Sequence, residues 1–372
     1  MKKRLKDILE YEQPSKYIVD SQNYSDDYQI PVLTAGKSFI LGYTNETEGV
    51  FEASKAPVII FDDFTAASKY VDFDFKVKSS AMKILHLSNP KDSLRYVYYA
   101  MQKIDYSPFS HKRIWISDYC NFEIELPTSS EQNRIVVELD TIQRAIDLKR
   151  KQLNDLDDLV KSKFQEMFGD ESKFEKSPLS KSVVEMFIGP FGSALKNECF
   201  VDKEDGYCIV YEQKHAIKKS IDLPARYITE KKYKELKRFT VLPGDIIISC
   251  RGTIGEVFTL PEGSPLGVIH PSLMKIRLKS DVYNNVFFTY IIEKYMQEHA
   301  YAAVGNCVKM AVTATVLGKE LFITPSMKMQ DDFALFNDKV RLAKSMVRAE
   351  INDLEELMES KMDEYFGEKK EP

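Results

Sequence analysis

Clustered cations are the residues of this chain whose types and spacing most readily suggest chemistry. Two groups occur in its second half: Lys214, Lys218 and Lys219, followed by Lys231, Lys232, Lys234, Lys237 and Arg238. The aromatic residues Tyr233 and Phe239 are interleaved with the second group. Cations at such spacing can contact the phosphates of a nucleic acid. A solvated helix face is the alternative interpretation of each lysine.

Arg251 is a candidate of a different kind, because it follows an apolar stretch and opens a glycine-rich turn. Val241–Gly255 reads VLPGDIIISCRGTIG, and Thr253 lies in the same turn. Gly252 and Gly255 permit a close approach of the backbone, and an arginine at this place could bind a guanine or a phosphate with both arms of its fork. The alternative is an arginine that holds the turn. In the first half, Lys69, Lys76 and Lys78 are further cationic candidates.

Catalysis is not indicated by the sequence. The stretch Asn89-Pro90-Lys91-Asp92 has one proline and no aromatic residue, so it does not match an adenine methyltransferase motif, and no G-x-x-x-x-G-K-S/T motif of a translocase is present. The five histidines are isolated, and the five cysteines include no C-x-x-C pair. We therefore expect no metal, no cofactor and no catalytic activity.

Length and composition indicate a protein of two folded domains. The chain has 372 residues, of which 44% are hydrophobic. No apolar run approaches the roughly 20 residues that a membrane span needs, and the N-terminus does not resemble a signal peptide. Scattered cysteines and the absence of targeting features favour a cytoplasmic location.

The net charge of −5 is unevenly distributed along the chain. Residues 1–130 carry −2, residues 131–172 carry −3, residues 173–330 carry +5 and residues 331–372 carry −5. The acidity therefore lies partly in residues 131–172 and 331–372, whereas residues 173–330 are basic. Such a local excess of positive charge is compatible with DNA binding by an acidic protein.

An internal repeat in the sequence predicts the elements that must position these residues. Gln152–Asp170 and Glu350–Glu368 align without a gap at an offset of 198 residues, and nine of their nineteen positions are identical. The same offset relates Pro127 to Pro325 and Gln132 to Gln330. The chain therefore consists of two variable segments, each followed by one copy of the repeat, and this order suggests an approximate twofold symmetry.

Each repeat predicts one long amphipathic helix. Glu131–Phe168 carries apolar residues at heptad spacing with a polar break at Lys149, and the second copy has polar breaks at Asn337 and Lys344. Each helix would be about 57 Å long. The two predict an antiparallel coiled coil in which the polar positions fix the register. Two helices packed separately on their own domains are the alternative.

The variable segments predict strands with some helix. Ala56–Phe64 and Thr240–Cys250 each run from a proline into an apolar stretch, and turns at Pro243–Gly244 and Arg251–Gly255 bracket the second strand. Arg95–Ile104 and Tyr283–His299 predict helices late in each segment. Each segment then ends on an apolar strand, at Phe122–Leu126 and at Glu320–Ile323. The predicted fold class is α+β, with two mixed α/β domains separated by the long antiparallel helices.

These features resemble the specificity subunits of type I restriction–modification systems. The resemblance rests on IGPFGSALK at Ile188–Lys196, on VLPGDIIISCRGTIG, on the Leu126–Pro127 and Thr324–Pro325 steps with a glutamine soon after each, and on the duplicated helix that ends in Phe-Gly. It implies target-recognition domains at residues 1–128 and 173–326, with conserved helices at 129–172 and 327–372. Each domain would read half of a gapped DNA site.

The resemblance also implies partners and further site residues. Two methyltransferase subunits would dock on the helices, a motor-nuclease subunit would join the complex, and the DNA would be double-stranded. Asn306 and Lys309 lie where members of the family place a loop near DNA, and an asparagine there could read adenine. His111, Lys112 and Arg113 occupy the corresponding place in the first domain.

The first variable segment departs from the family pattern, because Phe61–Lys69 has acidic residues where the second has Arg251. Asp62 or Asp63 could accept a hydrogen bond from a cytosine, although capping of a turn is the structural alternative. Two alternatives to the whole interpretation stay open. One is a protein-bridging scaffold on a coiled coil, and the other is a recognition subunit whose partner is a fused methyltransferase–nuclease.

Overall fold

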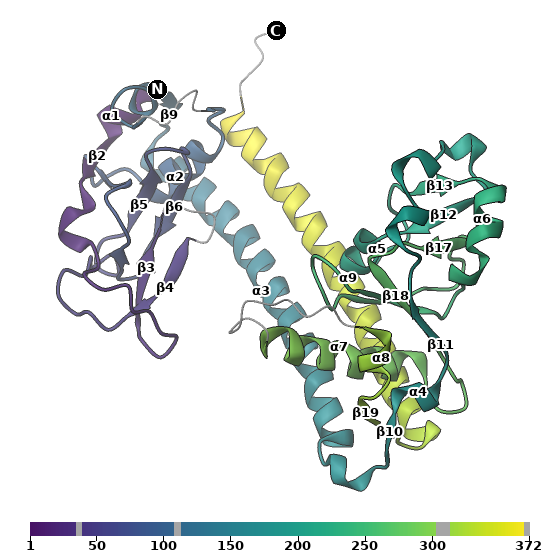
Figure 1. Ribbon diagram of the computed structural model, residues 1–372. Helices are drawn as coiled ribbons and strands as arrows, with labels where there is room; N and C mark the ends of the chain where they lie inside the picture. Colours follow the sequence, from purple (N-terminus) through teal and green to yellow (C-terminus); the bar gives the residue numbers. More distant parts are fainter. Residues whose placement is uncertain (35–38, 108–112, 303–312, 368–372) are drawn as a thin grey trace. The chain divides into compact units, whose positions relative to one another are not determined.

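The computed structural model describes residues 1–34, 39–107, 113–302 and 313–367, and the chain divides into two units (Figure 1). Unit 1 combines Met1–Gln152 with Val347–Pro372, and unit 2 comprises Leu153–Met346. The long helix α3 (Ser129–Phe168) begins in unit 1 and ends in unit 2, whereas α9 (Met327–Phe366) begins in unit 2 and ends in unit 1. Each unit is therefore built from one variable segment and two helix ends of opposite polarity.

Unit 1 is a small α+β assembly. Its elements before α3 are β1 (Lys2–Arg4), α1 (Leu5–Ile8), β2 (Leu9–Glu12), β3 (Ile30–Leu33), β4 (Ile40–Thr44), β5 (Val58–Asp62), β6 (Ser68–Val71), β7 (Lys76–Val77), β8 (Met82–Leu87), α2 (Leu94–Gln102) and β9 (Glu123–Glu125), with short 3₁₀ turns at Pro14–Tyr17 and Tyr119–Asn121. An antiparallel sheet has the order β2-β8-β5-β6, a second has the order β4-β3-β7 with β3 parallel to β7, and β1 pairs with β9.

Unit 2 repeats this plan with additions. Its elements between the long helices are β10 (Lys176–Pro178), α4 (Leu179–Ser182), β11 (Val183–Ile188), β12 (Cys208–Tyr211), α5 (Gln213–Lys218), β13 (Arg226–Ile228), α6 (Glu230–Leu236), β14 (Thr240–Val241), β15 (Ile246–Ser249), β16 (Val257–Thr259), β17 (Gly267–Ile269), β18 (Leu273–Leu278), α7 (Asn285–Ala302), α8 (Ala314–Leu317) and β19 (Leu321–Ile323), with 3₁₀ turns that include Gly192–Ala194 and Lys237–Phe239. The sheet β11-β18-β15-β16 corresponds to β2-β8-β5-β6, the sheet β13-β12-β17-β14 extends the β4-β3-β7 plan, and β10–β19 corresponds to β1–β9. The internal repeat that the helices predict therefore extends to the variable segments.

The central strands are buried on both faces, which explains their continuous apolar sequences. All five residues of β5 and all four of β15 are buried. Within Thr240–Cys250, the predicted turn at Pro243–Gly244 separates β14 from β15, and these two strands belong to different sheets. The chain turns between them at Gly244, whose φ of +84° favours glycine.

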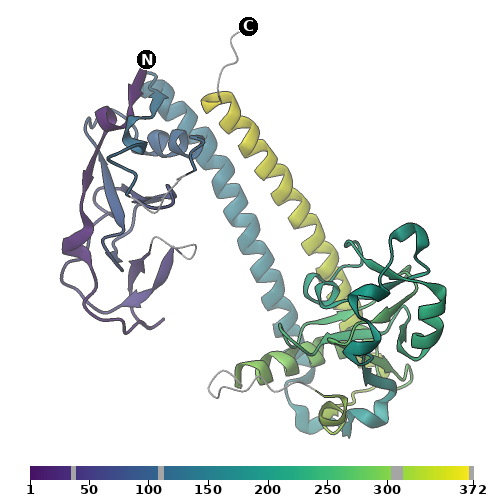
Figure 2. The ribbon, with the colours of Figure 1, turned by 45° about the horizontal axis from the view of Figure 1, so that its top comes forward.

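The two long helices pack against each other in opposite directions within each unit. In unit 1, Ile135 and Leu139 of α3 share a buried cluster with Met362 of α9. In unit 2, the ring of Phe164 lies 5.6 Å from that of Phe333, edge to face. Figure 2 shows the start of α3 (blue) beside the end of α9 (yellow) in unit 1. The predicted antiparallel helix pair is confirmed.

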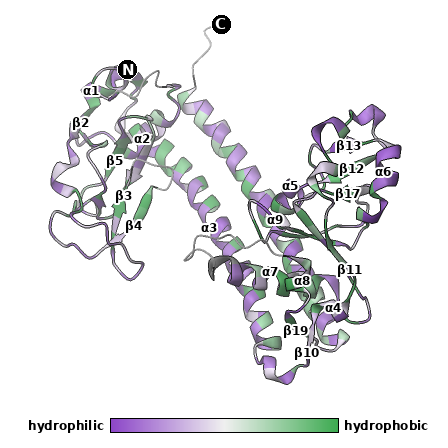
Figure 3. Ribbon diagram, in the orientation of Figure 1, coloured by the Kyte–Doolittle hydropathy of each residue, from purple (hydrophilic) through white to green (hydrophobic). Residues whose placement is uncertain are grey.

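Polar breaks in the heptads form ion pairs between the helices. Lys149 Nζ lies 2.6 Å from Glu350 Oε2 in unit 1, and Lys344 Nζ lies 2.5 Å from Asp157 Oδ1 in unit 2. Such partly exposed pairs contribute at most about 1 kcal/mol each, so their main effect is on register. Figure 3 shows hydrophilic and hydrophobic residues alternating along both helices, as their amphipathic sequences require.

Gln132 fastens the start of α3 to unit 1 from a completely buried position. Its Oε1 accepts a hydrogen bond from Ser93 N (2.7 Å), at the N-cap of α2. Its Nε2 donates to Pro127 O (3.0 Å) and to Asp92 Oδ1 (3.1 Å). The amide is therefore fully used, as a buried polar group must be.

Gln330 makes the equivalent contacts at the start of α9 in unit 2. Its Oε1 accepts from Asn284 N (2.9 Å), next to α7, and its Nε2 donates to Pro325 O (2.8 Å) and Val282 O (3.0 Å). The duplicated glutamine therefore performs the same task twice.

No helix in the described part of the chain is long and apolar enough to cross a membrane.

We expect Gln132→Leu to destabilise unit 1 by about 3 kcal/mol, because it leaves Ser93 N–H and Pro127 C=O buried without partners. Trp115 is the sole tryptophan and is buried in unit 1, so its fluorescence during urea unfolding measures this loss. Gln152→Leu, at an exposed position of α3, is the matched control. Equal unfolding midpoints for the two variants would contradict the clamp.

Candidate nucleic-acid interface

One end of the sheet β11-β18-β15-β16 gathers three loops of unit 2. Both β11 and β15 are antiparallel to the strand between them, β18, with Ile188 opposite Met274 and Ser249 opposite Leu273. Both strands therefore end where β18 begins. We call this surface the β18 edge and define it by residues 189–191, 250–255 and 270–272.

The 250–255 turn holds its backbone firmly and leaves its side chains outside. Gly252 and Gly255 have φ values of +68° and +91°, which favour glycine. Gln213 Nε2 donates to Arg251 O and to Thr253 O (2.9 Å), and Ser249 Oγ donates to Thr253 O (2.6 Å). The alternative in which the Arg251 side chain holds the turn is not needed, because Gln213 and Ser249 hold it.

The Arg251 side chain is exposed and forms no ion pair with any residue that the structure describes. Thr253 beside it is also exposed. A guanidinium held on a rigid turn, with its donors unused, can bind a phosphate or the edge of a guanine.

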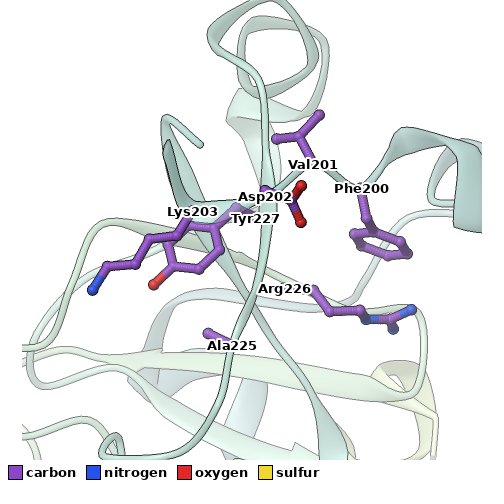
Figure 4. A pocket seen from close by; sticks show the side chains of 7 residues that line it. All are labelled: Phe200, Val201, Asp202, Lys203, Ala225, Arg226 and Tyr227. Carbon is purple, nitrogen blue, oxygen red and sulfur yellow. The ribbon is translucent and has the colours of Figure 1, made fainter. Parts of the chain in front are cut away.

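A charged cluster lies behind this turn. Glu212 forms ion pairs with Arg226 and with Lys214 (3.1 Å). Burial acts to raise the pKa of Glu212, but the hydrogen bonds and charges of Arg226 and Lys214 hold it below its ordinary value. The Arg226 guanidinium also lies 3.8 Å from the centre of the Phe200 ring, in a cavity of about 440 Å³ (Figure 4).

His270 is a neutral donor at the same edge. Burial lowers the pKa of its imidazole. Its Nδ1 accepts a hydrogen bond from Ser272 N (3.2 Å) and lies 2.8 Å from Ser272 Oγ. Acceptance at Nδ1 places the proton of the neutral ring on Nε2. His270 therefore offers one N–H donor close to the charges of Arg251 and Arg226, which also act on its titration.

The predicted lysine clusters are only partly available. Lys214 is paired with Glu212, Lys219 with Glu293 and Lys232 with Glu235. Lys218, Lys231 and Lys237 are exposed and form no ion pair among the described residues. Arg238 is also exposed, and its guanidinium lies 5.8 Å from the Phe187 ring near the end of β11, which brings it toward the β18 edge.

In unit 1, Lys69 is exposed on β6 and lines a cavity of about 560 Å³ between β6, α2 and the local ends of α3 and α9. Arg95 in that cavity is neutralised by Asp140 (2.8 Å). Arg113 is exposed. Four predicted residues, His111, Lys112, Asn306 and Lys309, lie outside the described residues.

Two other cations of unit 1 differ in their surroundings. Lys76 is buried, pairs with Glu46 (2.8 Å) and donates to Glu48 O (2.7 Å), which removes it from the candidates. Lys78 lies with its Nζ 5.7 Å from the Tyr24 ring.

Asp62 and Asp63 of unit 1 have structural roles, as the capping alternative predicts. Asp62 accepts from Phe64 N (2.9 Å) and Thr65 Oγ1 (2.5 Å). Asp63 accepts from Trp115 N (2.8 Å) and pairs with buried Lys83. Both carboxylates are buried and therefore face the protein, not a base.

Three residues of the β18 edge and its surroundings were not predicted as site residues from the sequence: Phe191, Arg226 and His270. Phe191 lies in a motif that carries the family resemblance, so its exposure was the missing fact. Arg226 and His270 gave no sequence signal, because strand pairing alone brings them to Glu212 and Arg251.

Among the described residues, no group of three or more His, Cys, Asp or Glu side chains could hold a metal ion.

Comparisons with known proteins agree with this architecture. Residues 1–157 match the model of the "Type I restriction modification DNA specificity domain". The EcoR124I/EcoR124II type I restriction enzyme specificity subunit of Escherichia coli is 51% identical over 146 residues, which are 38% of this chain and 36% of that relative. The alignment thus spans about a third of the relative's length.

Two solved structures share the fold over nearly the whole chain. The type I restriction–modification S subunit from M. genitalium has a TM-score of 0.56 at 14% identity and covers 98% of this chain and 96% of its own. A chain from a study of complex assembly and conformational transition of the type I R-M system has a TM-score of 0.56 at 15% identity and covers 98% and 97%. The resemblance to the specificity subunits of type I restriction–modification systems is therefore confirmed: residues 1–157 match their DNA specificity domain, and the chain as a whole shares the fold of these two solved structures.

Proposed function

We propose that this chain is the recognition subunit of a type I restriction–modification complex and that it reads a gapped, two-part site in double-stranded DNA. The observation that carries the proposal is the duplicated fold. Two units share one sheet plan, and each is closed by opposite ends of the same two helices. One half-site would be read by residues 1–128 and the other by residues 173–326. The paired helices at 129–172 and 327–372 would set the number of unread base pairs between them.

In the second half-site, the β18 edge is the reading surface. Arg251 and Thr253 would face the bases or phosphates from a turn whose backbone is already fixed by Gln213 and Ser249. A rigid backbone reduces the entropy lost on binding. Lys218, Lys237 and Arg238 would add phosphate contacts, which position the protein but carry no sequence information.

The chemistry would belong to other subunits in the cytoplasm. Two methyltransferase subunits would modify an adenine in each half-site after flipping it from the duplex, and motor-nuclease subunits would cleave unmodified DNA. This chain would direct both reactions by choosing the site. It would need no cofactor of its own.

A repeated set of exposed apolar residues supports the docking of two copies of one partner. Unit 1 exposes Val137, Leu148 and Leu357 on its helices. Unit 2 exposes Leu335, Met346 and Leu159, and each lies 198 residues from its counterpart.

The spacing within each set also favours a docking surface. Val137 and Leu148 are 11 residues apart, as are Leu335 and Met346. Eleven residues are just over three helical turns, so both members of a pair lie on one helix face. Large apolar side chains that remain exposed at equivalent places in both units are suited to bind identical methyltransferase subunits.

The proposal is tested by methylome sequencing of cells that carry this chain with its neighbouring methyltransferase, compared with cells that lack this chain alone. We expect modified adenine in both halves of one gapped motif and its loss on deletion. Unchanged methylation, together with recovery of protein partners but no methyltransferase, would favour the protein-bridging scaffold instead.

Arg251→Gln should weaken binding of the methyltransferase complex to its cognate duplex by about 10- to 100-fold, the range of one bidentate base contact. Competition with duplexes substituted at single base pairs should show relaxed discrimination at one position. Lys181→Gln is the control, because α4 precedes β11 at the opposite end of the sheet. Unchanged affinity of Arg251→Gln would exclude Arg251 from the interface.

Leu148→Asp should reduce the methyltransferase subunits bound per chain from two to one, because a carboxylate on a docking face must be desolvated. Met346→Asp should remove the other copy, and the double variant should remove both. Native mass spectrometry counts the subunits. Val316→Asp is the control, because Val316 is also an exposed apolar residue of unit 2 but lies on α8, outside the long helices. Retention of two subunits by the double variant would contradict this docking surface.

A further inference from the structure

Phe191 is the most exposed large hydrophobic residue among those that the structure describes, with 90% of its surface accessible. An aromatic side chain in water gives up the free energy that burial would provide. A single exposed apolar residue needs no explanation by itself. Phe191 stands apart because of the frame that holds it and the groups that surround it.

The frame fixes the Phe191 backbone on both sides. Pro190 before it is buried, and Leu195 after it is buried in the core of unit 2. Between them, Ala194 N donates to Phe191 O (2.8 Å). A side chain at Gly189 would meet His270 O, since a Cβ there would lie 2.4 Å from that oxygen. The loop therefore lies tightly on the start of β18 and presents the Phe191 ring to solvent.

Phe191 belongs to the same β18 edge as Arg251. The loops that carry them leave β11 and β15, which flank β18, so the strand ends from which the loops start are two strand spacings apart, or about 10 Å. The edge between them contains the His270 donor. An aromatic ring, an unpaired guanidinium and a neutral N–H donor at this spacing match the stacked bases and phosphates of a nucleic acid.

We propose that Phe191 stacks on a base or inserts at a base step of the DNA and thereby positions Arg251 over its target. This inference rests on the proposed function. Charge decides the occupant: Arg251, Arg238 and Lys218 leave this part of unit 2 with unpaired positive charge, which suits DNA. A wedge residue of this kind unstacks one step and allows the duplex to deform.

The contact should occur in one half-site only. The equivalent of β11 in unit 1 is β2, and the residues that follow β2 are Gln13, Pro14 and Ser15. Pro14 is buried like Pro190, but Ser15 stands in place of the phenylalanine. The two units therefore share the strand and the buried proline that follows it, and they differ in the next residue.

The test uses the complex of this chain with its methyltransferase and a duplex that carries the methylated motif. 2-Aminopurine replaces single bases, excluding the methylated adenines, because its fluorescence rises when a base is unstacked. We expect a signal near one half-site, lost in Phe191→Ala and retained in Phe191→Trp. Phe191→Ala should also bind about tenfold more weakly, the loss expected for one stacked base, with an unchanged salt dependence because no charge is removed.

Val184→Ala is the control, since it truncates an exposed apolar side chain on β11, the strand that leads to the Phe191 loop. Failure of the unaltered complex to bind the duplex would contradict the proposed function itself. Binding by the unaltered complex with equal affinity in Phe191→Ala would overturn only the stacking role. Loss of methyltransferase from the Phe191→Ala complex would also overturn it, because Phe191 would then contact protein.

Discussion

The structure depends on the need of two similar amphipathic helices to cover each other's apolar stripe. Neither α3 nor α9 could remain a stable 40-residue helix alone in water. Within unit 1, the first turns of α3 pack with the last turns of α9, and within unit 2 the last turns of α3 pack with the first turns of α9. Each variable segment then packs on an equivalent pair of helix ends, which are the start of the helix that follows it and the end of the other helix. The duplicated glutamines, Gln132 and Gln330, fasten the helix starts to these segments.

A common frame with divergent edges follows from this arrangement. The sheets β2-β8-β5-β6 and β11-β18-β15-β16 have the same strand order in the two units. The turns at the end of the frame differ: Asp62 and Asp63 are buried and used internally, whereas Arg251 is exposed and unused. A protein that reads two different half-sites can keep its core and change only these turns.

Sequence predicted the parts of the fold that depend on periodicity. The repeat at an offset of 198 residues, the heptads and the polar breaks at Lys149 and Lys344 sufficed to predict the antiparallel helix pair. The Pro243–Gly244 pair predicted the turn before β15, but not that β14 and β15 join different sheets, because local sequence does not encode strand partners. Nor did the sequence separate free lysines from neutralised ones, since the partners of Lys219 and Lys76 lie far away in the chain. Strand pairing places Phe191 and His270 at the same end of the sheet as Arg251 and brings Arg226 to Glu212, and no local pattern encodes this pairing. The base-contacting roles of all the candidate residues stay predictions.

The central claim is that the helix pair sets the gap between two independently read half-sites. It is tested most directly by deleting one heptad, about 10 Å of helix, from the middle of each helix at positions related by the repeat, and then sequencing the methylome. Our account predicts a methylated motif with a changed gap and both half-site sequences unchanged. A motif with the original gap, from a variant that still methylates DNA, would contradict it.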